Sequence, residues 1–226
     1  MKGDKLALWR RWVAANALGE LVGLGATGAI AALVFANLGE QNDTFAILTA
    51  FVLAVASGSV EATVLGLAQW WAMRPWFPTL GRRSWWLATL AGALIAYLLG
   101  YLPSTLGSLG EESAESPLAE APQWVVLALA AGLGIVTGAT LSLAQWLALR
   151  RHVRGAVLWV PANALAWMIG MPLIFWGMDL AQRAQALWQV ALLLAAVLLA
   201  AGAVVGAIHG AFLVRLAEDG WRAGGS

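Results

Sequence analysis

Two carboxylic acids and one histidine stand inside long apolar stretches of this sequence. They are Glu20, Glu61 and His209. A charged side chain in lipid is costly unless it is paired, so such residues usually mark a ligand or proton site. Two carboxylates in one low-dielectric bundle do not readily both ionise, and a histidine beside them adds a third proton-accepting group. These three residues are the predicted ligand or proton site; the alternative is that they only pack and hydrogen-bond within the protein.

Four side-chain amides form a second polar set, nearer to the ends of the apolar stretches. They are Asn16, Gln69, Gln145 and Asn163. Gln69 and Gln145 each precede an arginine by five residues, which is about 7.5 Å along a helix. An amide in lipid needs a partner, and interhelical hydrogen bonds of this kind contribute roughly 0.6–2 kcal/mol. We expect the four amides to form an interhelical polar layer with a structural role, with ligand contact as the alternative.

The composition requires lipid as the solvent around these groups. The chain has 226 residues, of which 61% are hydrophobic and 11% charged, and its mean hydropathy is +0.77. Soluble domains are only about 45–50% apolar and about 25% charged. Because about 20 apolar residues span a bilayer, the sequence predicts a single all-α integral membrane domain, 1–226, with six transmembrane helices. The predicted spans are 12–37, 45–73, 84–102, 123–149, 156–178 and 185–214.

The charges predict the orientation of these spans. With both termini on one side, every basic residue except Arg183 falls on that side. The opposite side carries an acidic loop, 103–122. Basic residues favour the cytoplasmic side, so the termini are expected inside the cell (N-in/C-in), in the cytoplasmic membrane of a bacterium.

Two phrases recur along the chain. "GLAQWWAMR" at 66–74 returns as "SLAQWLALR" at 142–150, and "WVAANAL" at 12–18 returns as "WVPANAL" at 159–165. A two-helix hairpin is therefore expected three times, its third copy split between the two ends of the chain. Small residues four apart precede each Gln position and predict close packing, expected among the second, fourth and sixth helices. Glu61 departs from the repeat, since its counterparts are Thr137 and Gly202.

The glycine-rich stripe followed by Gln-Trp-x-x-x-Arg and a Trp-led helix resembles a widespread group of bacterial polytopic membrane proteins without an assigned activity. The resemblance covers nearly the whole chain and implies an architecture, not a reaction. The third copy departs from the pattern, because His209-Gly210 replaces Ala-Gln.

The tryptophans suggest what such a bundle holds. The chain has fourteen tryptophans and no cysteine. Most of them, including Trp70, Trp85, Trp146 and Trp159, are expected in interfacial belts. Some are alternatively placed to stack on a flat apolar ligand such as a lipid, quinone or pigment. Metal-ligand spacing and nucleotide-binding motifs are absent, so neither a metal nor a nucleic acid is expected.

Three functions stay open on these grounds. The first is a non-enzymatic membrane subunit or binding module for an apolar ligand or partner helices, including a membrane-protein partner or a second copy. The second is a small proton-coupled transporter or solute-binding component that uses Glu20, Glu61 and His209. The third, an intramembrane enzyme, lacks a recognisable nucleophile, since span four reads "VTGATLS" where an intramembrane serine protease would need Gly-x-Ser-Gly.

Overall fold

The computed structural model describes residues 4–38, 44–110 and 121–223, and these are almost entirely helical. Six helices are long and apolar enough to cross a membrane within the described residues. A single short 3-10 turn, η1 (Ala156–Leu158), leads into the fifth of them. The helices are α1 (Lys5–Leu38), α2 (Thr44–Met73), α3 (Arg82–Leu109), α4 (Gln123–Leu149), α5 (Trp159–Gln182) and α6 (Leu187–Ala223).

The third helix is longer than its apolar stretch predicts. α3 continues through Pro103 to Leu109, whereas the sequence placed the start of a loop at 103. Hydroxyl groups along this last part donate to carbonyls of the preceding turn, at 2.9 Å from Ser104 to Tyr101 and 3.0 Å from Ser108 to Ser104. Hydropathy marks the part of a helix that lipid surrounds, and a polar end can extend beyond it. The remainder of the predicted acidic loop, 111–120, lies outside the described residues.

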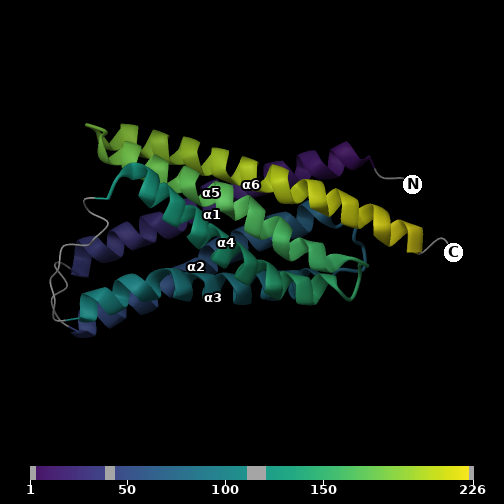
Figure 1. Cartoon of the computed structure of the whole chain (residues 1–226), viewed down its shortest axis with the longest axis horizontal. Helices are drawn as coiled ribbons and strands as arrows, with labels where there is room; N and C mark the ends of the chain where they lie inside the picture. The colour runs from purple at the N-terminus through teal and green to yellow at the C-terminus, as the bar shows by residue number, and fades with distance from the viewer. Residues whose placement is uncertain (1–3, 39–43, 111–120, 224–226) are drawn as a thin grey trace.

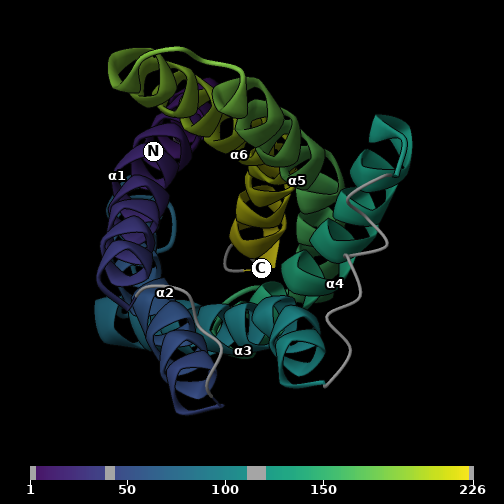
Figure 2. The ribbon, with the colours of Figure 1, turned by 90° about the vertical axis from the view of Figure 1, so that its left-hand side faces the viewer.

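The six helices form a closed ring in the order of the chain. Each helix packs mainly against its two neighbours in sequence, and α6 closes the ring against α1. Figure 2 shows this arrangement along the helix axes. Both termini lie at one end of the ring, together with the α2–α3 and α4–α5 connections (Figure 1). We call this the terminal end; the α5–α6 connection lies at the opposite end (Figure 1).

Glycines set the contacts between helices, but not in the expected way. The even-numbered helices were predicted to pack on one another, and this is wrong. Each instead presents its small residues to the odd-numbered helix that follows it, with α1 following α6. A Cβ added to these glycines would meet the next helix as follows: Gly66 to Thr89 Cβ at 3.2 Å, Gly138 to Asn163 O at 2.7 Å, and Gly206 to Asn16 Cβ at 2.9 Å. In a closed ring each helix packs mainly against its two neighbours, so the small-residue stripes lie at the contacts between adjacent helices.

The largest buried side chains gather toward the terminal end. Their main cluster contains residues from all six helices, including three tryptophans that are 0% exposed. The three are Trp12, Trp85 and Trp159. Farther along the ring, toward the opposite end, the interior is less completely filled.

Candidate ligand-binding cavity

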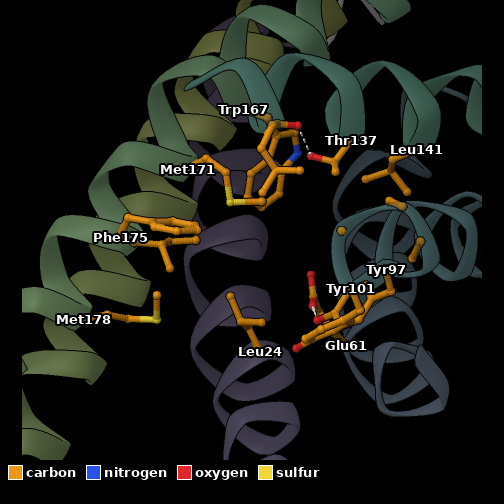
Figure 3. A pocket seen from close by; sticks show the side chains of 15 residues that line it. Leu24, Glu61, Tyr97, Tyr101, Thr137, Leu141, Trp167, Met171, Phe175 and Met178 are labelled. Carbon is orange, nitrogen blue, oxygen red and sulfur yellow. Dashed lines mark hydrogen bonds between the residues drawn. The ribbon is translucent and has the colours of Figure 1, made fainter. Parts of the chain in front are cut away.

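A cavity of about 340 Å³ lies within the ring, lined by fifteen residues from α1 to α5. Most of its wall is aliphatic, aromatic or methionine side chain, and Glu61 is the one acid or base in it among the described residues. Figure 3 shows Glu61, Tyr97 and Tyr101 on one wall and Met171 and Phe175 across from them. Pockets of about 300–1,000 Å³ with a mainly apolar lining and few polar groups are typical of small-molecule sites.

Glu61 is held in this wall by its neighbours on both sides. From α3, the Tyr97 hydroxyl donates a hydrogen bond to Glu61 Oε2. Gly58, one turn before Glu61, makes room for that tyrosine: a Cβ there would lie 2.8 Å from the Tyr97 ring. From α1, Gly23 allows the Glu61 backbone to approach, with its own added Cβ only 3.0 Å from Glu61 Cα. Two glycines thus place one carboxyl and its hydroxyl partner at the cavity.

Glu20 lies close by on α1, but its surroundings differ from those of Glu61. It is 1% exposed, and neither carboxyl oxygen has a hydrogen-bond partner among the described residues. Its side chain packs against α6, where a Cβ on Gly202 would lie 2.8 Å from Glu20 Cγ. Glu20 and Glu61 are near enough to interact electrostatically. The structure therefore brings together the two acids that the sequence singled out.

His209 does not join the two acids, so the three-residue cluster predicted from sequence is not formed. Trp12 Nε1 donates to His209 Nδ1 at 2.8 Å, and the imidazole lies against the rings of Trp12 and Trp159. No interaction of His209 with Glu20 or Glu61 occurs among the described residues. An Nδ1 that accepts a hydrogen bond carries no proton, so the ring is the neutral tautomer protonated at Nε2. The histidine belongs to the tryptophan cluster, nearer the terminal end.

The three buried tryptophans meet in the centre of the ring. Trp12, Trp85 and Trp159 pack edge to face, with ring centroids 5.8–6.5 Å apart. This is a favourable geometry for aromatic pairs. The sequence assigned Trp85 and Trp159 to an interfacial belt, which is wrong: each comes from a different odd-numbered helix and turns inward. Together the three indole rings fill the interior of the bundle on the terminal side of the cavity.

A chain of amide hydrogen bonds lies beside the tryptophans. Gln69 Nε2 donates to Asn16 Oδ1 at 2.8 Å, which joins α2 to α1. Gln145 Nε2 donates to Thr89 Oγ1 at 3.0 Å and, at 3.4 Å, to Gln69 Oε1. Gln145 Oε1 accepts from Trp159 Nε1 at 2.8 Å. Five helices are therefore tied by one polar network, and the Trp12–His209 bond adds the sixth.

Asn163 differs from the other three amides. Its Nδ2 donates at 2.9 Å to the carbonyl of Trp159, four residues back in the same helix. Asn16 makes the same bond to Trp12, at 2.8 Å, while its oxygen reaches Gln69. The predicted interhelical layer thus consists of Asn16, Gln69 and Gln145, and the Asn163 amide donates within α5.

The arginines of the repeated phrase lie over the tryptophans of the same phrase. The Arg74 guanidinium is 5.5 Å from the Trp70 ring centroid, and that of Arg150 is 5.0 Å from the Trp146 ring. Each pair is four residues apart on one helical face, so Gln-Trp-x-x-x-Arg combines an inward amide with a cation–π pair at the helix end. Among the described residues, no group of three or more His, Cys, Asp or Glu side chains offers a metal site.

Sequence reasoning missed most of the cavity wall. Tyr97 and Tyr101 were not selected, although they are the only two tyrosines in the chain and stand four residues apart. That spacing puts both on one helical face and was an available signal. The Met and Phe residues of α5 carried no such signal, because their types are ordinary in an apolar helix.

Comparison with known proteins adds no relative to these observations. No family model matches the chain, and neither the curated proteins nor the solved structures yield a match.

Proposed function

We propose that this protein is a membrane-embedded binding module that holds a small, mainly apolar molecule in the cavity of its helix ring. The observation that carries the proposal is the cavity itself: about 340 Å³, with Glu61 as the one acid or base in its wall among the described residues. Its size and lining suit a molecule with an apolar body and one polar contact.

A bilayer around the ring is supported by the outward side chains. Large apolar residues stay exposed on every helix, among them Leu187 at 87%, Trp124 at 72% and Trp188 at 64%. Such a surface is unsuited to water and suited to lipid. We place the protein in a bacterial cytoplasmic membrane, where the bilayer is its first partner.

The proposed orientation has the terminal end in the cytoplasm. Basic residues at that end support it, since arginines follow α2 and α4 and begin α3. Ser84 and Ser108 are exposed at opposite ends of α3, and the chain has no native cysteine. With the protein in intact cells, an impermeant thiol reagent is expected to label Ser108→Cys and to label Ser84→Cys only after permeabilisation. The reverse pattern would invert the topology.

A threefold repeat is part of the proposal. Two sets of equivalent contacts support it. Each odd-numbered helix supplies one tryptophan to the tryptophan cluster. Each even-numbered helix contacts the next odd-numbered helix through a glycine, with α1 following α6. The split third copy is represented by the α6–α1 contact. The proposed repeat concerns these helix contacts and does not extend to the residues of the cavity wall.

Proton-coupled transport is the second candidate, and one observation favours it. Glu20 and Glu61 form a buried acidic pair beside the cavity, an arrangement with which transporters exchange protons for substrate. Transport would also need a path past the tryptophan cluster, which fills the ring at its terminal end. Binding requires no such path, and we therefore prefer it.

A pair of substitutions on α3 tests the binding proposal. Ala96 lines the cavity, whereas Ala91 is exposed on the same helix. Ala96→Phe fills the cavity, and Ala91→Phe adds the same bulk toward lipid. In lipid nanodiscs, neopentylbenzene is expected to raise the Tm of the wild type and of Ala91→Phe but not that of Ala96→Phe. Equal shifts in all three proteins would mean that the probe acts through the lipid, and the proposal would fail.

A further inference from the structure

The ionisable side chains that line the cavity among the described residues are all acidic. Its wall contains one carboxyl, two phenols and no Lys, Arg or His among the described residues. Glu61 is on α2, which packs against α1 and α3. The titratable groups that face it from these helices are Glu20 on α1 and Tyr97 and Tyr101 on α3. None of these groups carries a positive charge to balance an ionised Glu61.

The second acid makes this imbalance greater. Glu20 is fully buried, its two oxygens have no hydrogen-bond partner among the described residues, and it interacts electrostatically with Glu61. An unpaired buried carboxylate is strongly unfavourable, so this part of the bundle favours neutral acids while no cation is bound. Any molecule that brings a positive charge to Glu61 removes this cost for one acid.

The rest of the wall suits the body of such a molecule. Aromatic rings face the cavity from two sides, with Tyr97 and Tyr101 on one wall and Phe175 on the opposite one (Figure 3). Met171 and Met178 add polarisable thioethers that adapt to irregular shapes. Aromatic faces attract ammonium groups, and the attraction is larger in a site from which water is excluded. An anionic ligand would find no Lys, Arg or His to pair with in this wall among the described residues.

We infer that the molecule held in this cavity is a lipophilic organic cation, an aromatic or branched ammonium compound whose charge lies at Glu61 between the tyrosine and phenylalanine rings. This deepens the proposed binding function and depends on it. Charge is conserved in a simple exchange: the cation enters, the Glu61 carboxyl loses its proton to water, and the resulting carboxylate pairs with the cation. No bond other than the acid O–H is broken. Since one proton leaves as the ligand binds, affinity rises with pH while the acid is protonated.

Two isosteric probes separate this inference from the function on which it rests. Benzyltrimethylammonium and neopentylbenzene share one shape, with a quaternary nitrogen in the first replaced by carbon in the second. Binding to the protein in nanodiscs is measured by the Tm shift as each probe is titrated. The cation is expected to bind wild type at least about tenfold more tightly than the neutral probe. Glu61→Gln should abolish that preference and leave neopentylbenzene binding unchanged.

A second substitution in the cavity wall tests whether any change of the lining has the same effect. Thr137 also lines the cavity, and its hydroxyl donates within its own helix at 2.9 Å, to Leu133. Thr137→Val should keep the preference for the cation. If neopentylbenzene binds and the cation does not, or if Glu61→Gln keeps the preference, the inference is overturned while the binding function stands. If neither probe binds the wild type, both are overturned.

Discussion

The two halves of the ring, one at the terminal end and one around the cavity, differ in how completely side chains fill the interior. Near the terminal end, three tryptophans and a chain of hydrogen-bonded amides fill the axis. The buried side-chain atoms there that lack a partner among the described residues are N–H groups, those of Arg11 Nε, Trp76 Nε1 and Trp85 Nε1. In the cavity half, Glu20, whose carboxyl has no hydrogen-bond partner among the described residues, lies near a space of about 340 Å³. Filled, satisfied interiors stabilise a fold, whereas voids and unpaired polar groups destabilise it. The contrast indicates that the filled terminal half stabilises the ring more than the cavity half does, which agrees with the binding function proposed above.

The largest loss of stability is expected from a large-to-small substitution in the tryptophan cluster of the terminal half. Trp159→Ala removes a 0% exposed ring from the tryptophan cluster and leaves Gln145 Oε1 without its donor. We expect a loss of about 3–5 kcal/mol, measured by thermal unfolding in detergent. Trp188, 64% exposed on α6, is the matched control, and Trp188→Ala should unfold nearly as wild type. Equal losses would show that the cluster is not a stabilising core.

The amide chain should contribute less than the rings. Gln145→Leu keeps the side-chain bulk but leaves Trp159 Nε1 without its acceptor and removes the donor to Thr89 Oγ1, whose own hydroxyl still donates to the Trp85 carbonyl. Stability should fall by about 1–2 kcal/mol. Thr140 on the same helix donates only within α4, at 2.8 Å to Val136, so Thr140→Val should be nearly neutral. Unchanged stability of Gln145→Leu together with lost probe binding would make the glutamine a ligand contact.

In the cavity half, removal of the Glu20 carboxyl should not lower the free energy of unfolding. Glu20→Met replaces an unpartnered carboxyl with an apolar chain of similar length. The free energy of unfolding should stay the same or rise by about 1 kcal/mol, because no hydrogen bond is lost and a desolvated group disappears. Glu61→Met loses the Tyr97 bond and should not show this gain. A clear loss in Glu20→Met would reveal a stabilising role for Glu20 and weaken the contrast.

The smallest signal is spectroscopic. An infrared carbonyl band of protonated carboxyl is expected near neutral pH in the ligand-free protein, because no basic side chain among the described residues pairs with either acid. The band should be reduced in Glu61→Gln and in Glu20→Met, and addition of benzyltrimethylammonium should reduce it in the wild type. A wild type without the band would have both acids ionised, and the proton exchange proposed for Glu61 would then be wrong.

The sequence predicted those features that depend on local pattern. Hydropathy identified six helices, and isolated acids in apolar runs identified Glu20 and Glu61 before their proximity was known. The inward position of Trp85 and Trp159 was missed, because a tryptophan near a helix end looks the same in a belt and in a core. The order of the ring was also missed: four-residue spacing shows that a helix has a close partner and does not show which helix it is.

The cavity wall is a tertiary property and could not be predicted from composition. Thr137 and Gly202 were identified as counterparts of Glu61, yet Thr137 lines the cavity while Gly202 packs against α1. The repeat therefore does not determine the site. His209 shows the same limit: its residue type suggested proton chemistry, and its place beside Trp12 makes it a hydrogen-bond acceptor in the core.

The contact between α6 and α1 has a consequence for how the protein is made. It joins α1 to α6, the first and the last of these six helices in chain order, and it covers Glu20. Until α6 is inserted, that acid has no protein neighbour on this side and must face lipid or the insertion machinery. If the six helices enter a bilayer in chain order, a chain that ends before residue 187 would leave this acid without its α6 contact, and an unpaired acid in lipid is costly.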